Sequence, residues 1–330
     1  MTMVTSIAAP AFADAYGIAL YGTHYLDQGN ITVEVRGGQY YVNDVLDDDG
    51  PVIIKNHEDE SDTTSVSNTI TIHAEDGEAN VTLKDVDIVT NGEANKSGIT
   101  VKADKTKTAT ATVNVTLDNV TVDAREDASS EGATGGAGMT IQGNGVVNIE
   151  LDGKNELLAG DGHAGLEKNR TESVGSLNIN DSNEDGGSLT AIGGDGGAGI
   201  GGGKGDMGSG LYILNGTVNA YGKGGGAGIG GGDGAGAHMV GLNAGVPGVN
   251  DAYEPTVTAV GSEGAAGIGG GKGGRLTDAV LSSGTLTGTM ETLEYLQAHG
   301  AQTIVFTTSQ RTSSFQISDL LALADEGDVF

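Results

Sequence analysis

The chain contains no cysteine among its 330 residues. Disulfide bonds are therefore excluded, and so are zinc sites built from thiolates and catalysis by a thiol nucleophile. The stability of the fold must come from other interactions.

Basic residues are also few: 16 Lys and Arg stand against 45 Asp and Glu, which gives a formal net charge of -29. This charge repels the phosphate backbone of nucleic acids and the surface of anionic membranes. Apolar runs are short as well, and none approaches the roughly 18 residues that a membrane helix requires. We therefore expect no nucleic-acid partner and no membrane span.

Tryptophan is absent, and aromatic residues make up only 4% of the chain. Aromatic rings combine a large apolar face with a polar edge, which suits them to stacking on sugars, so their scarcity weakens a sugar-stacking function. The best available platforms are Tyr212, Tyr221 and Tyr253, with Asp251 beside Tyr253 on the longest expected loop. A tyrosine at these places can equally well cover the interior of the protein.

Glycine, by contrast, is abundant, with 59 residues. Many glycines belong to a motif that reads GGAGIGGGKG from Gly196, GGAGIGGGDG from Gly225 and GAAGIGGGKG from Gly264. No G-X-Y period runs through the chain, so a collagen helix is excluded. Shorter copies, each with a small residue, a glycine and a large aliphatic residue, precede these at 97–99, 137–139 and 164–166.

The segments between these copies carry two further strand signals, in which apolar and polar residues alternate, as in GLYILNGTVNAYG. Three short strands in each repeat predict an all-β fold, a right-handed parallel β-helix or solenoid. Equivalent side chains of successive turns would then lie about 4.8 Å apart. We expect Ile200, Ile229 and Ile268 to form a buried column, with glycines beside them that let adjacent turns approach closely.

The N-terminus carries a pattern typical of exported proteins. Ala11 and Ala13 follow an apolar run in the A-x-A arrangement of a signal-peptide cleavage site. Residues 1–13 are therefore interpreted as the end of a truncated signal peptide, cleaved before Asp14. A short hydrophobic N-terminal strand is the alternative interpretation.

The rest of the chain is expected to divide into three segments. Residues 14–60 are interpreted as strands that cap the open end of the solenoid, because an uncovered end exposes unpaired edges. Residues 61–288 form the expected solenoid, and residues 289–330 a small α+β segment with two helices and two strands. We expect this last segment to be incomplete, which would make the chain part of a longer multi-domain surface protein.

One acidic segment resembles a calcium loop. Asp181, Asn183, Asp185 and Gly186 follow the order D-x-N-x-D-G. Ile192 occupies the position at which an EF-hand carries its bidentate glutamate, so an EF-hand is excluded. A different calcium loop and a solvated turn both remain open, and calcium is the single ion considered, since nothing in the sequence requires a cofactor.

Catalysis was considered because enzymes with β-helical folds cleave polysaccharides on the flank of the solenoid, using paired carboxylates or a base assisted by acids. Candidate carboxylates are Asp118, Asp123 and Asp152, and the main loop arginines are Arg125 and Arg170. The six histidines show neither H-x-H nor H-E-x-x-H spacing, and no G-x-S-x-G or phosphate loop occurs in a suitable context. No residue is therefore assigned a catalytic role.

These motifs carry a resemblance to a family. VTSIAAPAFA resembles the signal-peptide end of exported proteins of Gram-positive gut Firmicutes, and the GGAGIGGG and GxVxAxG units between about residues 70 and 288 resemble the glycine-rich β-helical repeats of their large surface proteins. Such proteins are described as adhesin-like or as containing carbohydrate-binding domains. The resemblance implies display at the cell surface and glycan binding, without assigning any residue.

We therefore expect a secreted or cell-surface, non-catalytic module that binds polysaccharide, host glycans or matrix, or that serves in adhesin-like display. Its specificity is expected in the segments 125–135 and 238–255, which interrupt the repeats, because loops on one side of a stack usually carry binding. The alternative is a polysaccharide lyase or glycoside hydrolase that acts on the solenoid flank.

Overall fold

The structure is a computed structural model that describes residues 22–48, 50–106, 109–125, 134–242 and 255–274, together with four further strands toward the C-terminus. The described residues form β-strands and one short 3-10 helix, η1 (Leu26–Gln28). The strands assemble into three long sheets, called A, B and C below. The prediction of an all-β fold is confirmed.

Sheet A has 11 strands. They pair in parallel, except that the final two form an antiparallel pair. In hydrogen-bonding order they are β1 (Gly22–Tyr25), β5 (Val52–Lys55), β7 (Glu78–Lys84), β10 (Thr112–Asp118), β13 (Val146–Asp152), β16 (Ser176–Asn180), β19 (Gly208–Ile213), β22 (Ala237–Leu242), β25 (Ala279–Leu281), β27 (Thr303–Thr307) and β28 (Thr312–Gln316).

Sheet B has 10 strands and begins with two antiparallel pairings before it becomes parallel. In order these strands are β4 (Val45–Asp47), β3 (Gln39–Val42), β2 (Ile31–Arg36), β6 (Ile70–Ala74), β9 (Ile99–Ala103), β12 (Met139–Gln142), β15 (Leu166–Glu167), β18 (Ile200–Gly201), β21 (Ile229–Gly230) and β24 (Ile268–Gly269).

Sheet C has 7 strands, all parallel. In order they are β8 (Asp87–Val89), β11 (Thr121–Ala124), β14 (Lys154–Ala159), β17 (Ser188–Asp195), β20 (Thr217–Lys223), β23 (Thr256–Val260) and β26 (Thr285–Thr287).

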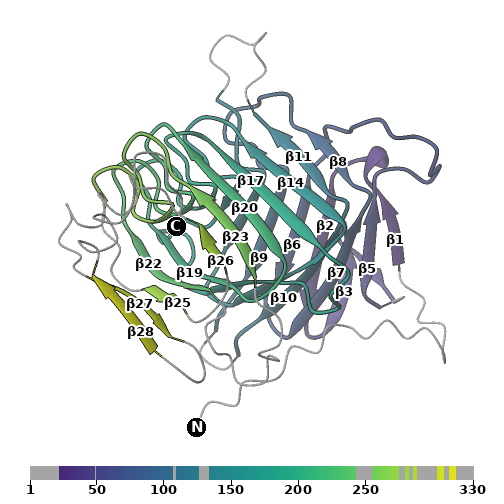
Figure 1. The fold of residues 1–330 in the computed structure, drawn as a ribbon. Helices are drawn as coiled ribbons and strands as arrows, with labels where there is room; N and C mark the ends of the chain where they lie inside the picture. Colours follow the sequence, from purple (N-terminus) through teal and green to yellow (C-terminus); the bar gives the residue numbers. More distant parts are fainter. Residues whose placement is uncertain are drawn as a thin grey trace.

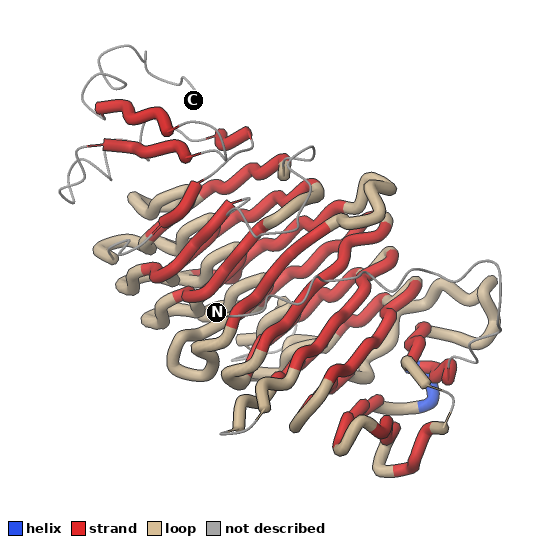
Figure 2. Tube along the Cα trace, turned by 90° about the horizontal axis from the view of Figure 1, so that it is seen from below, coloured by secondary structure: helices blue, strands red, loops and turns tan. Residues whose placement is uncertain are grey.

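The chain visits these sheets in a fixed rotation. From β6 to β26 successive strands belong to sheets B, A and C in turn, and each strand from β6 to β23 pairs with the strand three places later. One set of three successive strands is called a repeat here. The colours of Figure 1 accordingly advance along the stack of strands from purple to yellow, and Figure 2 shows the strands of successive repeats lying side by side.

The repeated isoleucines occupy equivalent places in sheet B. Ile200 pairs with Ile229 and Ile229 with Ile268, and all three side chains are buried. The predicted column is therefore confirmed. It extends toward the N-terminus through residues that also lie in register and are buried, namely Leu166, Met139, Ile99, Ile70 and Ile31.

The glycine that follows each isoleucine is required by the backbone. Gly201 and Gly230 have φ angles of 133° and 139°, a region that residues with a side chain rarely adopt. A β-carbon on Gly201 would lie 2.0 Å from the carbonyl oxygen of Gly230, and one on Gly230 would lie 1.8 Å from that of Gly269. The expectation that glycines permit close approach of adjacent repeats is confirmed at these positions.

One inward column of side chains in sheet C becomes smaller along the stack. Ile88, Val122 and Leu157 occupy one column in the first repeats. The same column continues as Ala191, Ala220 and Ala259, which are also buried. In this column, the glycine-rich repeats thus carry smaller side chains than the repeats before them.

The expectations for the two ends are tested only in part. The strands expected near residues 303–308 and 313–317 are confirmed as β27 and β28. The helices expected within 290–300 and 318–327, like residues 1–13, lie outside the described residues, and the domain boundaries stay predictions. In the part of the chain that is described, no helix has the length and apolar character needed to cross a bilayer.

Candidate functional site

The outward face of sheet C carries ordered rows of small polar side chains. Strand residues alternate between inside and outside, so the buried Leu189, Val218 and Val257 separate two outward rows. One row contains Ser188, Thr217 and Thr256, and the other contains Thr190, Asn219 and Thr258. Their side chains are half-buried, apart from Thr256, which is exposed.

The rows follow from parallel pairing without a register shift. Equivalent residues of adjacent parallel strands lie about 4.8 Å apart, so each row presents hydroxyl or amide groups at a regular spacing along the stack. The backbone of β26 continues both rows in register, because Thr285 pairs with Thr256 and Thr287 with Thr258. The array therefore repeats the same polar chemistry from one repeat to the next.

A third row on this face is apolar and aromatic. Ile192 pairs with Tyr221, and Tyr221 with Val260. Val260 is 39% exposed, and the side chains of Ile192 and Tyr221 are half-buried. The three rows together form what is called the neutral face here, made of the outward residues of 188–192, 217–221 and 256–260.

The neutral face contains no charged residue, although the chain carries 45 acidic residues. The same two polar rows carry charge in the preceding repeat, where Lys154 pairs with Ser188 and Glu156 with Thr190. Asp195 and Lys223, at the far ends of β17 and β20, pair with each other just outside it. The neutral face is therefore an uncharged area with charged residues next to it.

The two described tyrosines among the residues predicted for binding, Tyr212 and Tyr221, lie on different sheets. Tyr221 lies on the neutral face, whereas Tyr212 lies on sheet A between Asn178 and Gly241, where burial raises its pKa. Tyr253 and Asp251 lie outside the described residues. Of the two predicted residues that the structure describes, Tyr221 belongs to the candidate face and Tyr212 does not.

Tyr212 occupies the next position in a row of sheet A whose preceding members are hydrogen-bonded asparagines. Asn114 donates from its side-chain amide to Asn80 at 2.8 Å, Asn148 to Asn114 at 2.7 Å, and Asn178 to Asn148 at 2.7 Å. Because amide side chains both donate and accept, the ladder satisfies much of its own hydrogen-bonding capacity. Sheet A is therefore a weaker candidate for ligand binding than the neutral face.

Carboxylates and an arginine meet elsewhere on sheet C. Arg125 donates to both carboxylate oxygens of Asp123, at 2.9 and 2.6 Å. These hydrogen bonds lower the pKa of Asp123. Burial raises the pKa of Asp87, and the charge of Asp123 raises it further. Glu156 is also charged and lies in the row that contains Thr121 and Asp87.

The calcium candidates form a turn rather than a group of converging carboxylates. Asn180 pairs with Glu150, so the next residue, Asp181, occupies the position that Leu151 has one repeat earlier. Both side chains are buried. Its Oδ2 accepts from the backbone of Gly187 at 3.1 Å, while its Oδ1 is buried without a hydrogen-bond partner. Burial raises the pKa of Asp181, and the nearby Asp185 adds to this.

Asn183 and Asp185, both exposed, complete this turn. The side chain of Asn183 donates to Asp152 at 3.0 Å and accepts from the backbone N–H of Asp185 at 3.3 Å. Within the described ranges, no three His, Asp or Glu side chains are grouped so that they could hold a metal ion. Calcium binding stays a prediction.

The loops in which specificity was expected are described only at their ends. Arg125 and residues 134–135 bound the first, and β22 contains residues 238–242 of the second. Residues 126–133 and 243–254 lie outside the described residues. Their role in binding stays a prediction.

Sequence reasoning missed the neutral face, although a signal for it exists. The segments SLTAI, TVNAY and TVTAV share one pattern at equivalent positions of three repeats. Their period of two predicts which residues point outward, and a comparison of these outward residues alone reveals the absence of charge. No protein-family model, no curated protein and no solved structure matches this chain.

Proposed function

We propose that this chain is a secreted or cell-surface, non-catalytic module that binds an uncharged linear glycan. We further propose that its three sheets are the faces of a right-handed parallel β-helix. The regular rotation of the chain through sheets B, A and C supports this fold, and parallel crossover connections are right-handed in about 98% of cases.

The neutral face is the observation on which the binding function rests. Hydroxyl and amide groups both donate and accept hydrogen bonds, as the hydroxyls of a sugar do. Tyr221 adds an aromatic ring beside these rows, on which the apolar face of a sugar can stack. Because the rows repeat along the stack, they suit a polymer with a repeating unit.

The charge distribution favours an uncharged ligand. The chain has a formal net charge of -29, which repels uronic-acid and sulfated polymers at ordinary ionic strength. The neutral face itself provides no cation for such polymers. A neutral glycan meets neither repulsion nor an unpaired charge there.

A glycan array probed with residues 14–330 tests this function. We expect binding to neutral linear glycans and little binding to acidic ones. Replacing both Thr217 and Thr256 by Val removes two hydroxyls while keeping the shape of the side chains, and each lost hydrogen bond should weaken binding by about threefold to tenfold.

The matched control is the same pair of changes on sheet B, at Thr71 and Thr100, which are half-buried and in register. This control variant should bind like the wild-type chain. Equal binding by the two double variants would exclude the neutral face as the site, and the absence of binding to any glycan would contradict the function itself.

A glycan-cleaving enzyme is the second candidate, and the group formed by Asp87, Asp123 and Arg125 favours it. The pKa of Asp87 is raised and that of Asp123 lowered, and such a difference separates an acid from a base in carbohydrate-cleaving sites. Release of unsaturated or reducing sugars by the wild-type chain but not by Asp123→Asn would establish this alternative over the non-catalytic function.

A further inference from the structure

A polar segment covers the open edge of sheet C. β8 is the last strand of this sheet, and Val66 forms an isolated parallel bridge to Ile88 on its free side. The N–H of Val66 donates to the carbonyl of Asp87 at 2.9 Å, and the N–H of Val89 donates to the carbonyl of Val66 at 2.8 Å. Residues 57–66 are called the latch segment below.

Asn56, just before the latch segment, completes the cover. It is buried, its Oδ1 accepts from the N–H of Asp87 at 3.1 Å, and its Nδ2 donates to the carbonyls of Asp87 and Thr64 at 3.1 and 3.0 Å. Unpaired edge groups recruit foreign strands. Asn56 and Val66 together therefore protect an edge that would otherwise be open to another chain.

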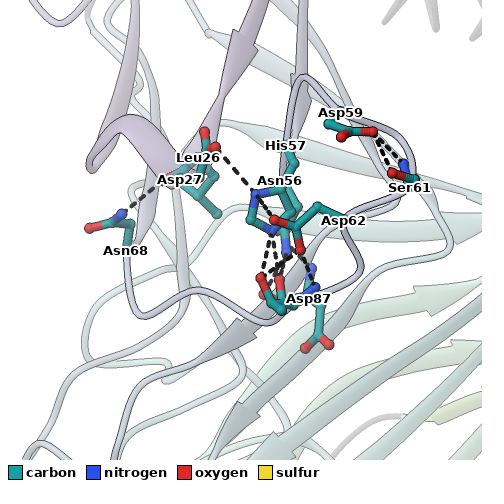
Figure 3. Close-up of polar contacts among 10 residues, drawn as sticks. Leu26, Asp27, Asn56, His57, Asp59, Ser61, Asp62, Asn68 and Asp87 are labelled. Atoms are coloured by element: carbon teal, nitrogen blue, oxygen red, sulfur yellow. Dashed lines mark hydrogen bonds and ion pairs between the residues drawn. The ribbon is translucent and has the colours of Figure 1, made fainter.

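His57 holds the latch segment against η1, as Figure 3 shows. Its Nε2 lies 2.7 Å from the carbonyl oxygen of Thr64, and its Nδ1 lies 3.2 Å from Oδ2 of Asp27 and 3.7 Å from Oδ2 of Asp62. The side chain of His57 is only 9% exposed. The ring thus joins two parts of the chain that are 30 residues apart in sequence.

These contacts specify the protonated ring. A carbonyl oxygen can only accept, so Nε2 must carry a hydrogen to bond Thr64. A carboxylate also only accepts, so Nδ1 must carry a hydrogen as well. A neutral ring that keeps its bond to Thr64 would turn a lone pair toward two carboxylates and lose its attraction to Asp27 and Asp62.

We propose that His57 is a pH-operated latch: its imidazolium form holds the segment 57–66 across the edge of sheet C, and loss of the proton releases that segment. The acids that face the ring are Asp27 from η1 and Asp59 and Asp62 from the latch segment itself. Release breaks the hydrogen bonds that Val66 makes to the carbonyl of Asp87 and to the N–H of Val89.

The direction of the effect follows from the same contacts. The hydrogen bond to Thr64, followed by the hydrogen bond to Asp27 and the charge of Asp62, raises the pKa of His57 above its ordinary value. A group whose pKa is raised by folding contributes stability below its unfolded pKa of about 6.5, and this contribution is lost as pH rises through the folded value. The latch is therefore closed in mildly acidic solution and opens as the solution becomes alkaline.

Amide hydrogen exchange of the full chain, followed by NMR at about pH 5.5 and about pH 8.5, tests the latch. The reporters are the amides of Val66 and Val89, whose hydrogen bonds exist only when the segment is closed. We expect their protection factors to fall by about tenfold for each unit by which the pKa of His57 is raised. The amide of Val115, inside sheet A, should keep its protection at both pH values.

Three variants make the test specific. His57→Gln removes the titration, so low protection at both pH values is expected for Val66 and Val89. Asp27→Asn keeps the ring but removes one carboxylate, so opening should begin at lower pH. His73→Gln is the matched control, because His73 also lies against a carboxylate, Asp104 at 2.9 Å, but belongs to β6 of sheet B and not to the latch segment.

Two results would overturn the proposal. One is protection of Val66 and Val89 in the wild-type chain that does not change with pH. The other is protection in His57→Gln that matches the wild-type values at pH 5.5. If His57→Gln is not folded, the shift of the opening midpoint in Asp27→Asn decides the question alone.

Discussion

At the scale of single residues, the most unusual side chain is Lys168. It is fully buried, and its Nζ donates to the carbonyls of Ser209 and Ser173 at 2.6 and 3.3 Å, with no carboxylate among these partners. Lys168 comes directly after β15. Its position corresponds to Ile141 in the preceding repeat and to Gly202 in the following repeat. Lys168 thus lies where large inward side chains give way to glycine.

The burial of Lys168 predicts a pH dependence of stability. Burial lowers its pKa from 10.5 to about 8, so the folded chain holds this proton less tightly than the unfolded chain does. Stability should therefore rise between about pH 8 and pH 10.5, by about 3 kcal/mol at most from this group. Lys168→Met should remove this rise and be at least as stable as the wild type near pH 7.

Urea unfolding at several pH values measures this difference. The control is Lys272→Met, which removes an exposed lysine from a turn and should leave the pH dependence of the wild-type chain in place. A Lys168→Met variant with the same pH dependence as the wild type would show that this lysine does not titrate differently in the two states.

At the scale of the strand, stability depends on columns of side chains that cross from one repeat to the next. Ile229 contacts equivalent isoleucines on both sides through the pairing of β18, β21 and β24. Because each repeat rests mainly on its neighbours, a defect in the middle of a column weakens two interfaces together.

Substitution of Ile229 tests the column. Ile229→Ala should destabilise the chain by about 2–5 kcal/mol, as truncation of a fully buried aliphatic side chain usually does. Ile229→Asp should abolish cooperative unfolding, because it buries a carboxylate without a partner. Thermal unfolding followed by circular dichroism measures both, with Val260→Ala, at a 39% exposed position, as the control. An unchanged melting curve for Ile229→Asp would refute the column.

The strands also show what sequence could and could not predict. The isoleucine column was predictable because the motif recurs, and equivalent sequence positions take equivalent places in a stack. The buried Lys168 and the covered edge at Asp87 were not, since both depend on contacts with residues that share no repeated pattern, such as Ser209 and Asn56. The histidines lack metal-binding spacing, so the sequence offers no pattern that singles out His57.

At the scale of the whole molecule, the dominant quantity is the net charge of -29. Such an excess of one sign opposes the compact state through repulsion among the carboxylates. Cations pair with few of these groups, since only 16 lysines and arginines are present. Screening by dissolved salt should therefore have an unusually large effect on this fold.

Raising NaCl from about 20 mM to about 300 mM should stabilise the chain, because the screening length falls below the separation of many surface charges. Each kcal/mol gained should raise Tm by about 1–2 °C for a chain of this size.

A comparison of CaCl2 with MgCl2 at equal ionic strength tests the calcium prediction at Asp181. A greater stabilisation by calcium would support that site, and equal curves would refute it.

The regular rows of sheet C have one more consequence. A polymer bound along Thr217 and Thr256 can shift by one repeat and meet the same groups again, so several bound positions have nearly equal energy. The bound chain then gains positional entropy, and it can move along the face by one-dimensional diffusion without dissociating. A protein of this construction would hold a long strand tightly as a whole while leaving it free to slide.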